Sequence, residues 1–227
     1  MKRLFITLAF CFSLSVAAVA QNVQLVNDLG IQSDELADVQ ERIAEKVDDF
    51  QRWIQDLAGR GNVSHNTKIE IYDRTLKLFI GEGKSYRTQE PSPYGGYIEK
   101  EHEAVKMTTI NSKYKKLKSH YPMTTYLSNL IKRSETPNYR YSQIVIEAAD
   151  AVRVDNFSKI GDGRYVATAH ILQHFMGYSS DGRRVQYEDY TAKTITIYIN
   201  RLEINTPEGI NVIWQILLGD VDCDDIW

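Results

Sequence analysis

Hydrophobic and polar residues alternate with a helical period in the first third of the chain. Apolar residues recur every three or four positions over residues 33–58, which predicts one long amphipathic helix with Ser33 as a favourable N-cap. Its predicted stripe is Leu36, Val39, Ile43, Val47, Phe50, Ile54 and Leu57. A second helix is predicted from about residue 66 to residue 79. Its predicted stripe is Ile69, Tyr72, Leu76 and Phe79.

From Tyr141 onward the period changes to two, which predicts strands. The expected strands are 142–154 (with a bend at Ala148-Ala149), 164–178, 185–204 and 210–221. Turn signals separate them, such as Asp162-Gly163 and Pro207-Glu208-Gly209. In the third strand, one predicted face carries Ile195, Ile197 and Ile199, and the other carries Thr194, Thr196 and Tyr198. Short turns between successive strands predict an antiparallel meander.

The middle of the chain gives weaker patterns. Glycines and prolines are frequent over residues 81–97, and this segment is interpreted as a loop. A strand over 104–111 and a short helix over 124–132 follow, separated by a lysine-rich segment. Helices at the N-terminal end and long strands at the C-terminal end indicate an α+β fold. We expect N-terminal helices packed on a strongly curved, mostly antiparallel sheet, which together form a cone with a pocket.

The N-terminus has the pattern of a secretory signal. Lys2 and Arg3 precede an apolar run from Leu4 to Val19, and the run ends in Ala18-Val19-Ala20. We interpret residues 1–20 as a cleaved signal peptide and 21–227 as a single domain. An uncleaved membrane anchor is the alternative, but the run is short for a bilayer span. The prediction is an exported protein, periplasmic or secreted, that is not membrane-spanning after cleavage.

Charge and cysteine content narrow the function classes. The formal net charge is −3, which disfavours binding to nucleic acid. Cys11 would leave with the signal, so Cys223 would have no partner within the chain, and a disulfide framework or a cysteine-rich zinc site is excluded. Cys223 is interpreted as a small buried residue of the last strand, with a cross-link between two chains as the alternative. No metal and no cofactor are expected.

The order of these elements resembles the nuclear transport factor 2-like superfamily, a cystatin-like α+β cone. The resemblance covers roughly residues 33–222, and it is strongest in the last strands. These are Tyr165-Val-Ala-Thr-Ala-His170, Thr194-Ile-Thr-Ile-Tyr198 and Trp214-Gln-Ile-Leu-Leu-Gly219-Asp220. With the signal pattern, the resemblance implies an exported bacterial member of this superfamily. The family includes acid/base isomerases and dehydratases, ligand carriers and non-catalytic assembly domains, so the fold alone selects no function. For this chain, we expect Trp53, Tyr72 and Trp214 at the ligand pocket.

Two residues are candidates for catalysis, Asp150 and His170. If the alternation of its strand holds, Asp150 lies on the more apolar face, where partial desolvation would suit it to proton transfer. If Ala148-Ala149-Asp150 is a bend, Asp150 lies in water instead. His170 shares a face with His174, which allows an acid/base or metal pair. The opposite face of that strand is more apolar, which favours a structural position for both histidines on the outer side.

Three functions remain open. The first is a non-catalytic exported domain that binds a small molecule, a glycan or an envelope protein through the cone mouth and the loop 81–97. The second is a cofactor-free isomerase or dehydratase in which Asp150 moves the proton, with His170 or a tyrosine of the pocket as its partner. The third is a homodimeric envelope scaffold that uses the sheet face carrying Thr194, Thr196 and Tyr198. Lys113, Lys115, Lys116 and Lys118 form a basic cluster, which we interpret as a solvated surface rather than a site for an anionic glycan or a lipid head group.

Overall fold

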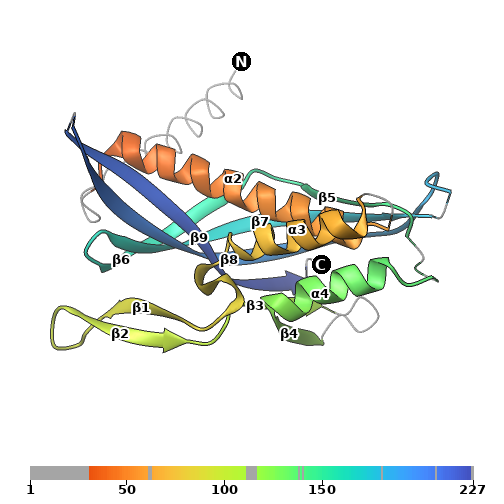
Figure 1. Cartoon of the computed structure of the whole chain (residues 1–227), viewed down its shortest axis with the longest axis horizontal. Helices are drawn as coiled ribbons and strands as arrows, with labels where there is room; N and C mark the ends of the chain where they lie inside the picture. Colours follow the sequence, from red (N-terminus) through yellow and green to blue (C-terminus); the bar gives the residue numbers. More distant parts are fainter. Residues whose placement is uncertain are drawn as a thin grey trace, which may run out of the picture. The chain divides into compact units, whose positions relative to one another are not determined.

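The structure is a computed structural model, drawn as a ribbon in Figure 1. It describes residues 31–60, 63–110, 117–137, 139, 141–179, 181–207 and 209–225. The predicted signal peptide and the lysines from 113 to 116 lie outside the described residues. The chain divides into two compact units, residues 1–41 and 42–227, and everything below concerns the second unit except where stated. The prediction of one domain over 21–227 stays a prediction.

Helix α2 (Ser33–Ala58) confirms the first predicted helix at both ends. In the first unit, the carboxylate of Glu35 accepts a hydrogen bond from the backbone nitrogen of Gln32 (3.1 Å), which satisfies one free N–H at the helix start. In the second unit, the predicted stripe is buried: Ile43, Val47, Phe50, Ile54 and Leu57. Among the described residues, no helix combines the length and the apolar character needed to cross a membrane.

Helix α3 (His65–Leu76) begins at Ser64, whose hydroxyl accepts a hydrogen bond from Thr67 N (3.2 Å). The predicted stripe of this helix is wrong, because Ile69 is 45% exposed while Lys68, Ile71 and Thr75 are buried. The buried face of α3 carries Lys68 beside the neighbouring helix α4 (Met123–Ser134). The Nζ of Lys68 donates to Ser134 Oγ over 2.6 Å, and this hydrogen bond satisfies a polar group that the apolar pattern alone does not place inside.

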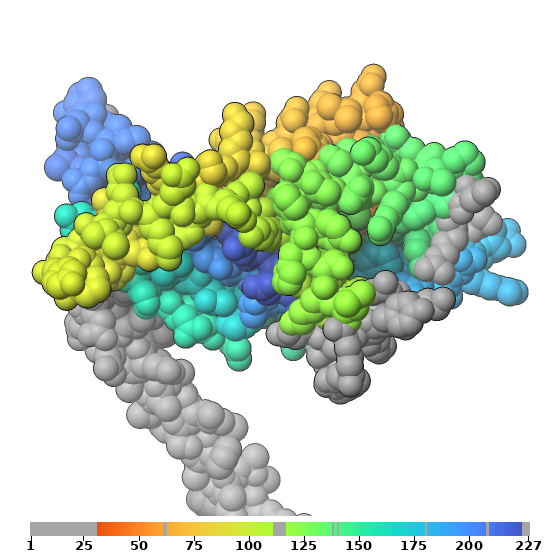
Figure 2. Space-filling view, turned by 90° about the horizontal axis from the view of Figure 1, so that it is seen from below, coloured from red at the N-terminus to blue at the C-terminus, as the bar shows by residue number. Residues whose placement is uncertain are grey.

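The segment predicted as a loop, 81–97, is mostly regular structure. A short 3₁₀ turn η1 (Ile80–Gly83) leads into strand β1 (Tyr86–Pro91), which pairs antiparallel with β2 (Tyr97–His102). Except for Pro91, which ends β1, the glycines and prolines belong to the turns at either end, and Gly95 and Gly96 adopt positive φ in the turn between the strands. The loop prediction is therefore wrong for β1. Figure 2 shows this hairpin in yellow-green beside the green α4 segment, with blue C-terminal strand atoms between them.

The main sheet has seven strands, and it is not closed into a barrel. Its strands are β3 (Lys106–Ile110), β4 (Lys118–Pro122), β5 (Ile144–Ala148), β6 (Arg153–Gly161), β7 (Arg164–Tyr178), β8 (Val185–Thr206) and β9 (Gly209–Asp225). The order is β4-β3-β9-β8-β7-β5, and β6 also pairs with β7. All neighbouring pairs are antiparallel except β3 with β9, which is parallel. The α+β class is confirmed, and the sheet is mixed.

The meander β7-β8-β9 follows the predicted strands closely, and β7 has the predicted ends. The predicted strand 142–154 is wrong as one element, because the chain leaves the sheet between β5 and β6. Ala148 pairs with Gln173 and Arg153 pairs with His170, so four residues, 149–152, lie opposite only two residues of β7. The two extra residues cannot pair, and the chain bulges out at this point.

The helices and the inner face of the sheet share a core. Ile195, Ile197 and Ile199 are buried, as the alternation predicted. The rings of Phe50 on α2 and Phe79 meet edge to face, with centroids 5.1 Å apart. Figure 1 shows α3 and α4 on the same side of the strands. The buried apolar stripes of the helices therefore contribute to one core with this face of the sheet.

A bulge in β9 keeps its two halves turned to the same core. Ile195 pairs with Val221 and Ile197 pairs with Leu218, so β9 carries one extra residue at Gly219–Asp220. The bulge places the carboxylate of Asp220 where its Oδ1 accepts a hydrogen bond from Lys106 N (2.7 Å). Beyond the bulge, Val221 and Cys223 are both buried. The bulge thus fixes the start of β3 and directs Cys223 inward.

Candidate functional site

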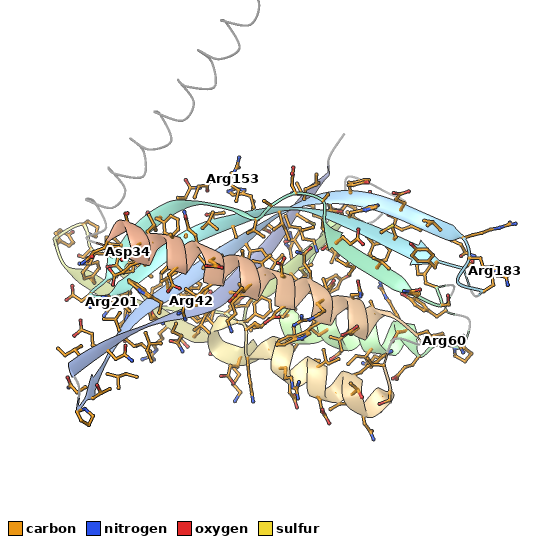
Figure 3. All side chains as sticks on the ribbon, turned by 90° about the horizontal axis from the view of Figure 1, so that it is seen from above. Asp34, Arg42, Arg60, Arg153, Arg183 and Arg201 are labelled. Carbon is orange, nitrogen blue, oxygen red and sulfur yellow. The ribbon has the colours of Figure 1, made fainter. Side chains whose placement is uncertain are left out.

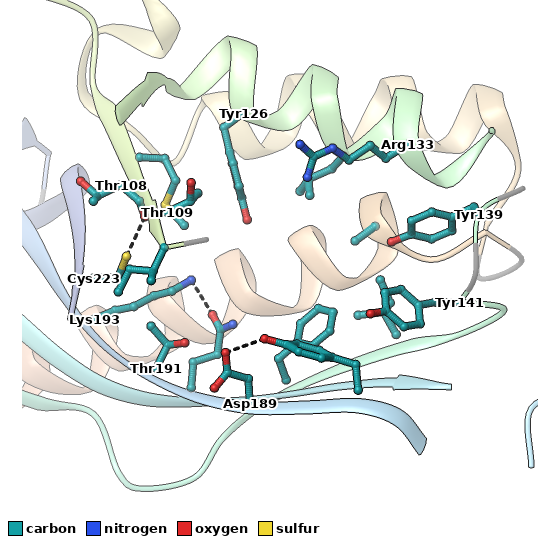
Figure 4. Close-up of a pocket in the computed structure, with 18 of the residues that line it drawn as sticks. Thr108, Thr109, Tyr126, Arg133, Tyr139, Tyr141, Asp189, Thr191, Lys193 and Cys223 are labelled. Carbon is teal, nitrogen blue, oxygen red and sulfur yellow. Dashed lines mark hydrogen bonds between the residues drawn. The ribbon is translucent and has the colours of Figure 1, made fainter. Parts of the chain in front are cut away.

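A cavity of about 700 Å³ lies among α4, β3 and the inner faces of β7, β8 and β9 (Figure 4). It is lined by Ala58, Met107, Thr108, Thr109, Ile110, Tyr126, Leu130, Arg133, Thr136, Tyr139, Tyr141, Ile144, Gln173, Phe175, Tyr187, Asp189, Thr191, Lys193 and Cys223. The lining is a mixture of aromatic rings, hydroxyl groups and a few charged side chains. A cavity of this size and composition suits a small molecule.

Lys193 is the most unusual group in this lining. It continues the buried alternation of Ile195 toward the start of β8, and only 6% of the residue is exposed. Its Nζ donates a hydrogen bond to Oε1 of Gln173 on β7 (2.6 Å). Burial lowers the pKa of Lys193 to about 8, because the charged amine is poorly solvated inside the protein. The cavity therefore contains an amine that is partly neutral near pH 8.

Cys223 stands next to this amine. It pairs directly with Lys193 across β8 and β9, and its Sγ donates to the carbonyl oxygen of Thr108 (3.1 Å). The prediction of a buried residue in the last strand is confirmed for Cys223. Tyr126 of α4 reaches into the same space, and Figure 4 shows its hydroxyl pointing into the cavity. Burial raises the pKa of the Tyr126 hydroxyl, so this group stays protonated and can donate a hydrogen bond.

A chain of aromatic rings forms another part of the lining. Ring centroids are 5.6 Å apart for Tyr139 and Tyr141, 6.3 Å for Tyr141 and Phe175, and 5.8 Å for Phe175 and Tyr187. All three pairs are edge to face, the arrangement that aromatic quadrupoles favour. The Tyr187 hydroxyl donates to the carboxylate of Asp189 over 2.7 Å. In Figure 4, Tyr139 and Tyr141 lie well apart from Lys193 along the cavity.

The expected pocket residues lie elsewhere, because Trp53, Tyr72 and Trp214 are not among the residues that line this cavity. Trp53 on α2 and Tyr72 on α3 are half-buried. Trp214 is buried against Tyr165, with ring centroids 6.1 Å apart. The expectation placed the pocket near the first helices. The cavity instead lies between α4 and the sheet.

The two predicted catalytic residues are not brought together. Asp150 is exposed, in the bulge between β5 and β6, so the premise of an apolar environment is wrong for it. His170 lies on the more exposed face of β7, where its Nε2 contacts Asp155 Oδ1 at 2.9 Å. Neither residue is among those that line the cavity.

His174, on the same face as His170, pairs with Glu188 (Nε2 to Oε1, 2.7 Å) and stacks on Tyr190 with centroids 4.3 Å apart. Both histidines therefore occupy the outer position that the alternation favoured. Arg153 forms an ion pair with Asp155, the carboxylate that contacts His170 (Figure 3). Arg183, also labelled in Figure 3, lies in the connection between β7 and β8. In the described part of the chain, no three His, Cys, Asp or Glu side chains gather as a metal site.

A second cavity, of about 500 Å³, lies between β1 and the meander, and its lining includes Arg87, Arg164 and Arg201. Arg87 is within 4 Å of Glu99 and Glu101, and Arg201 contacts Glu203. The positive charges of two of these three arginines are thus already compensated by neighbouring glutamates. By comparison, the first cavity holds a cation that is far more deeply buried.

Sequence reasoning missed Lys193 and Gln173, although a signal was present. The alternation that assigns Ile195, Ile197 and Ile199 to one strand face also assigns Lys193 to that face. In the preceding strand, the face that carries Ala167, Ala169 and Ile171 also carries Gln173. A lysine on an apolar strand face is rare, so the alternation alone singles out Lys193 as a candidate site residue. In comparisons with known proteins, no family model, curated protein or solved structure matches this chain.

Proposed function

We propose that this chain is an exported, non-catalytic binding domain that holds a small molecule in the cavity around Lys193. The observation that carries the proposal is the cavity of about 700 Å³, in which a buried amine and hydroxyl groups accompany a chain of aromatic rings. Such a combination provides apolar contact area together with a few polar groups that fix a ligand's orientation. A binding function needs no further chemistry from the protein.

The proposal includes a fold relationship and a location. The order of elements resembles the nuclear transport factor 2-like cone: helices α2 and α3 come first, α4 follows, and the long strands come last. This resemblance supports a pocket between the helices and a curved sheet. The signal pattern of residues 1–20 supports export to the periplasm or the medium. An intact mass that begins at Gln21 after export tests the location, and a full-length mass contradicts it.

The alternatives receive less support. The acid/base enzyme requires a desolvated Asp150, but this residue is exposed and does not line the cavity. The homodimeric scaffold uses the outer face around Thr194, Thr196 and Tyr198. The rings of Tyr198 and Tyr86 have centroids 5.8 Å apart, so the β1–β2 hairpin already covers part of that face.

Analysis of molecules that co-purify with the chain tests the proposal. The protein is isolated from the exported fraction, checked by native mass spectrometry, and extracted with solvent. The matched variants are Thr191→Phe, which places a ring in the cavity, and Thr194→Phe, which places the same ring on the outer face. We expect a ligand mass in the wild type and in Thr194→Phe and its loss in Thr191→Phe. Equal ligand content in all three proteins would overturn the proposal.

A further inference from the structure

Lys193 is a buried cation that lacks an anionic partner among the described residues. The only hydrogen bond of its Nζ there is to the neutral amide oxygen of Gln173, and no described carboxylate forms an ion pair with it. An ammonium group has three donors, and transferring its charge out of water is unfavourable unless an anion compensates. The buried amine therefore has unused donors and an uncompensated charge at the surface of a cavity.

The other charged groups at the cavity leave this position open. Asp189, on the same strand, is engaged by the Tyr187 hydroxyl. Arg133, on α4, is exposed and adds a second positive charge to the lining. Cys223 on β9 lies opposite Lys193 in the sheet, and Tyr126 on α4 lines the same cavity. Burial raises the pKa of the Tyr126 hydroxyl, so this group carries a proton. The charge balance of the lining is therefore positive.

The rest of the cavity is aromatic. Tyr139, Tyr141, Phe175 and Tyr187 form a continuous series of edge-to-face contacts. In Figure 4, Tyr139 and Tyr141 lie at one end of the cavity and Lys193 at the other. A ligand that fills this space would meet a cation at one end and flat apolar surfaces at the other.

Resting on the binding function above, we propose that the ligand is a small amphipathic acid, whose carboxylate pairs with Lys193 and whose aromatic or aliphatic body contacts the rings of Tyr141, Phe175 and Tyr187. The carboxylate supplies the missing negative charge and accepts the free ammonium hydrogens in charge-assisted hydrogen bonds. The Tyr126 hydroxyl faces the same space and offers a further donor. A neutral ligand of the same shape would leave the buried charge uncompensated.

This pairing has a pH signature. Without ligand, burial holds the pKa of Lys193 at about 8, so the amine loses its proton above that pH. A bound carboxylate stabilises the protonated form, so acid binding requires the proton. The affinity for an acid is therefore constant well below pH 8 and falls, by up to tenfold per pH unit, between the pKa of the free amine and the higher pKa of the acid-bound amine. The affinity for a neutral analogue does not fall over this interval.

Calorimetric titration of the purified chain with matched acid and amide probes tests the inference. The probes are phenylacetate, 4-phenylbutyrate and octanoate, each with its primary amide, between pH 6.5 and 9.5. The variants are Lys193→Met and, as a control, the exposed Lys132→Met on α4. We expect at least one acid to bind the wild type and Lys132→Met ten times more tightly than its amide. In Lys193→Met this preference disappears.

Two results would overturn the inference, and they differ in what else they affect. Amides that bind as well as acids, or an acid preference that survives in Lys193→Met, would contradict the acid pairing alone. An absence of binding by every probe, charged or neutral, would contradict both the inference and the proposed binding function. If Lys193→Met does not fold, the pH dependence of acid affinity in the wild type still decides the question. An acid affinity that does not change between pH 6.5 and 9.5 contradicts the pairing.

Discussion

Lys193 on β8 and Cys223 on β9 lie directly opposite each other in the sheet, and both side chains are buried at the same cavity. This pair places a desolvated amine beside a thiol on the inner face of the two C-terminal strands. Because the amine has a lowered pKa while an unfolded lysine does not, Lys193 makes the stability of the protein depend on pH.

The first prediction concerns that dependence in the variant Lys193→Met. The folded pKa is about 8 and the ordinary value is 10.5, so the unfolded state binds more protons between these values. Wild-type stability therefore rises as pH increases from 8 to 10.5. The difference corresponds to about 3 kcal/mol, at about 1.4 kcal/mol per pH unit.

Lys193→Met cannot show this rise, so its stability relative to the wild type falls over the same interval. Urea unfolding at pH 7, 8, 9 and 10 measures the effect, with Lys132→Met as the control. A constant difference between Lys193→Met and the wild type across these values would show that Lys193 is not desolvated.

The orientation of α3 is tested by two isoleucines that lie two positions apart. Ile71 is buried, and replacing it with alanine removes core contacts, which costs about 3 kcal/mol. Ile69 is largely exposed, and Ile69→Ala changes stability by no more than about 0.5 kcal/mol. Both variants change the same residue type in the same helix, so helix propensity cancels. Equal losses in urea unfolding would favour the apolar stripe read from the sequence.

The β9 bulge depends on a glycine. A Cβ at Gly219 would lie 2.8 Å from the ring of Tyr198 and 3.2 Å from the carbonyl oxygen of Thr196. We expect Gly219→Ala to destabilise the protein by about 2 kcal/mol, since the crowding involves the backbone as well as a ring. In a Tyr198→Ala background part of the crowding is gone, so the loss is smaller. Thermal unfolding of the four proteins measures this coupling, and strictly additive effects would contradict the packing around the bulge.

Burial of Cys223 predicts low reactivity. Its Sγ is directed to the Thr108 carbonyl, and only 2% of the residue is exposed. Bulky maleimides should label the native chain far more slowly than the urea-unfolded chain. Non-reducing gels should show no covalent dimer. A dimer that disappears in Cys223→Ser would instead support the cross-link considered from the sequence.

The parts of the fold that sequence reasoning located are those in which one face is buried and the other is not. Strand β7 and the isoleucines of β8 follow this rule, so their alternation was a sufficient guide. The β1–β2 hairpin was missed because β2 is exposed along almost its whole length and shows no alternation. The buried face of α3 was missed because Lys68 is held by a hydrogen bond to Ser134, a residue 66 positions away.

The expected site residues do not coincide with the cavity around Lys193, for related reasons. Trp53 and Tyr72 are half-buried and Trp214 packs against Tyr165, and none of the three borders this cavity. Asp150 was selected from an alternation that the extra residues between β5 and β6 interrupt. Lys193 was present in a correctly predicted strand, but its importance depends on the cavity, which forms only when α4 and β3 are in place.

The most direct test of the account is the pKa of Lys193, measured by NMR in protein labelled with ¹³C at the lysine ε carbon. The signal is assigned by its absence in Lys193→Met, and it is followed from pH 6 to pH 11 without ligand. The account predicts a midpoint of about 8, well below the values of the exposed lysines, and an upward shift when a bound acid is present. A midpoint near 10.5 for Lys193 would mean that its amine is solvated, and it would contradict the buried cation on which the proposed site depends.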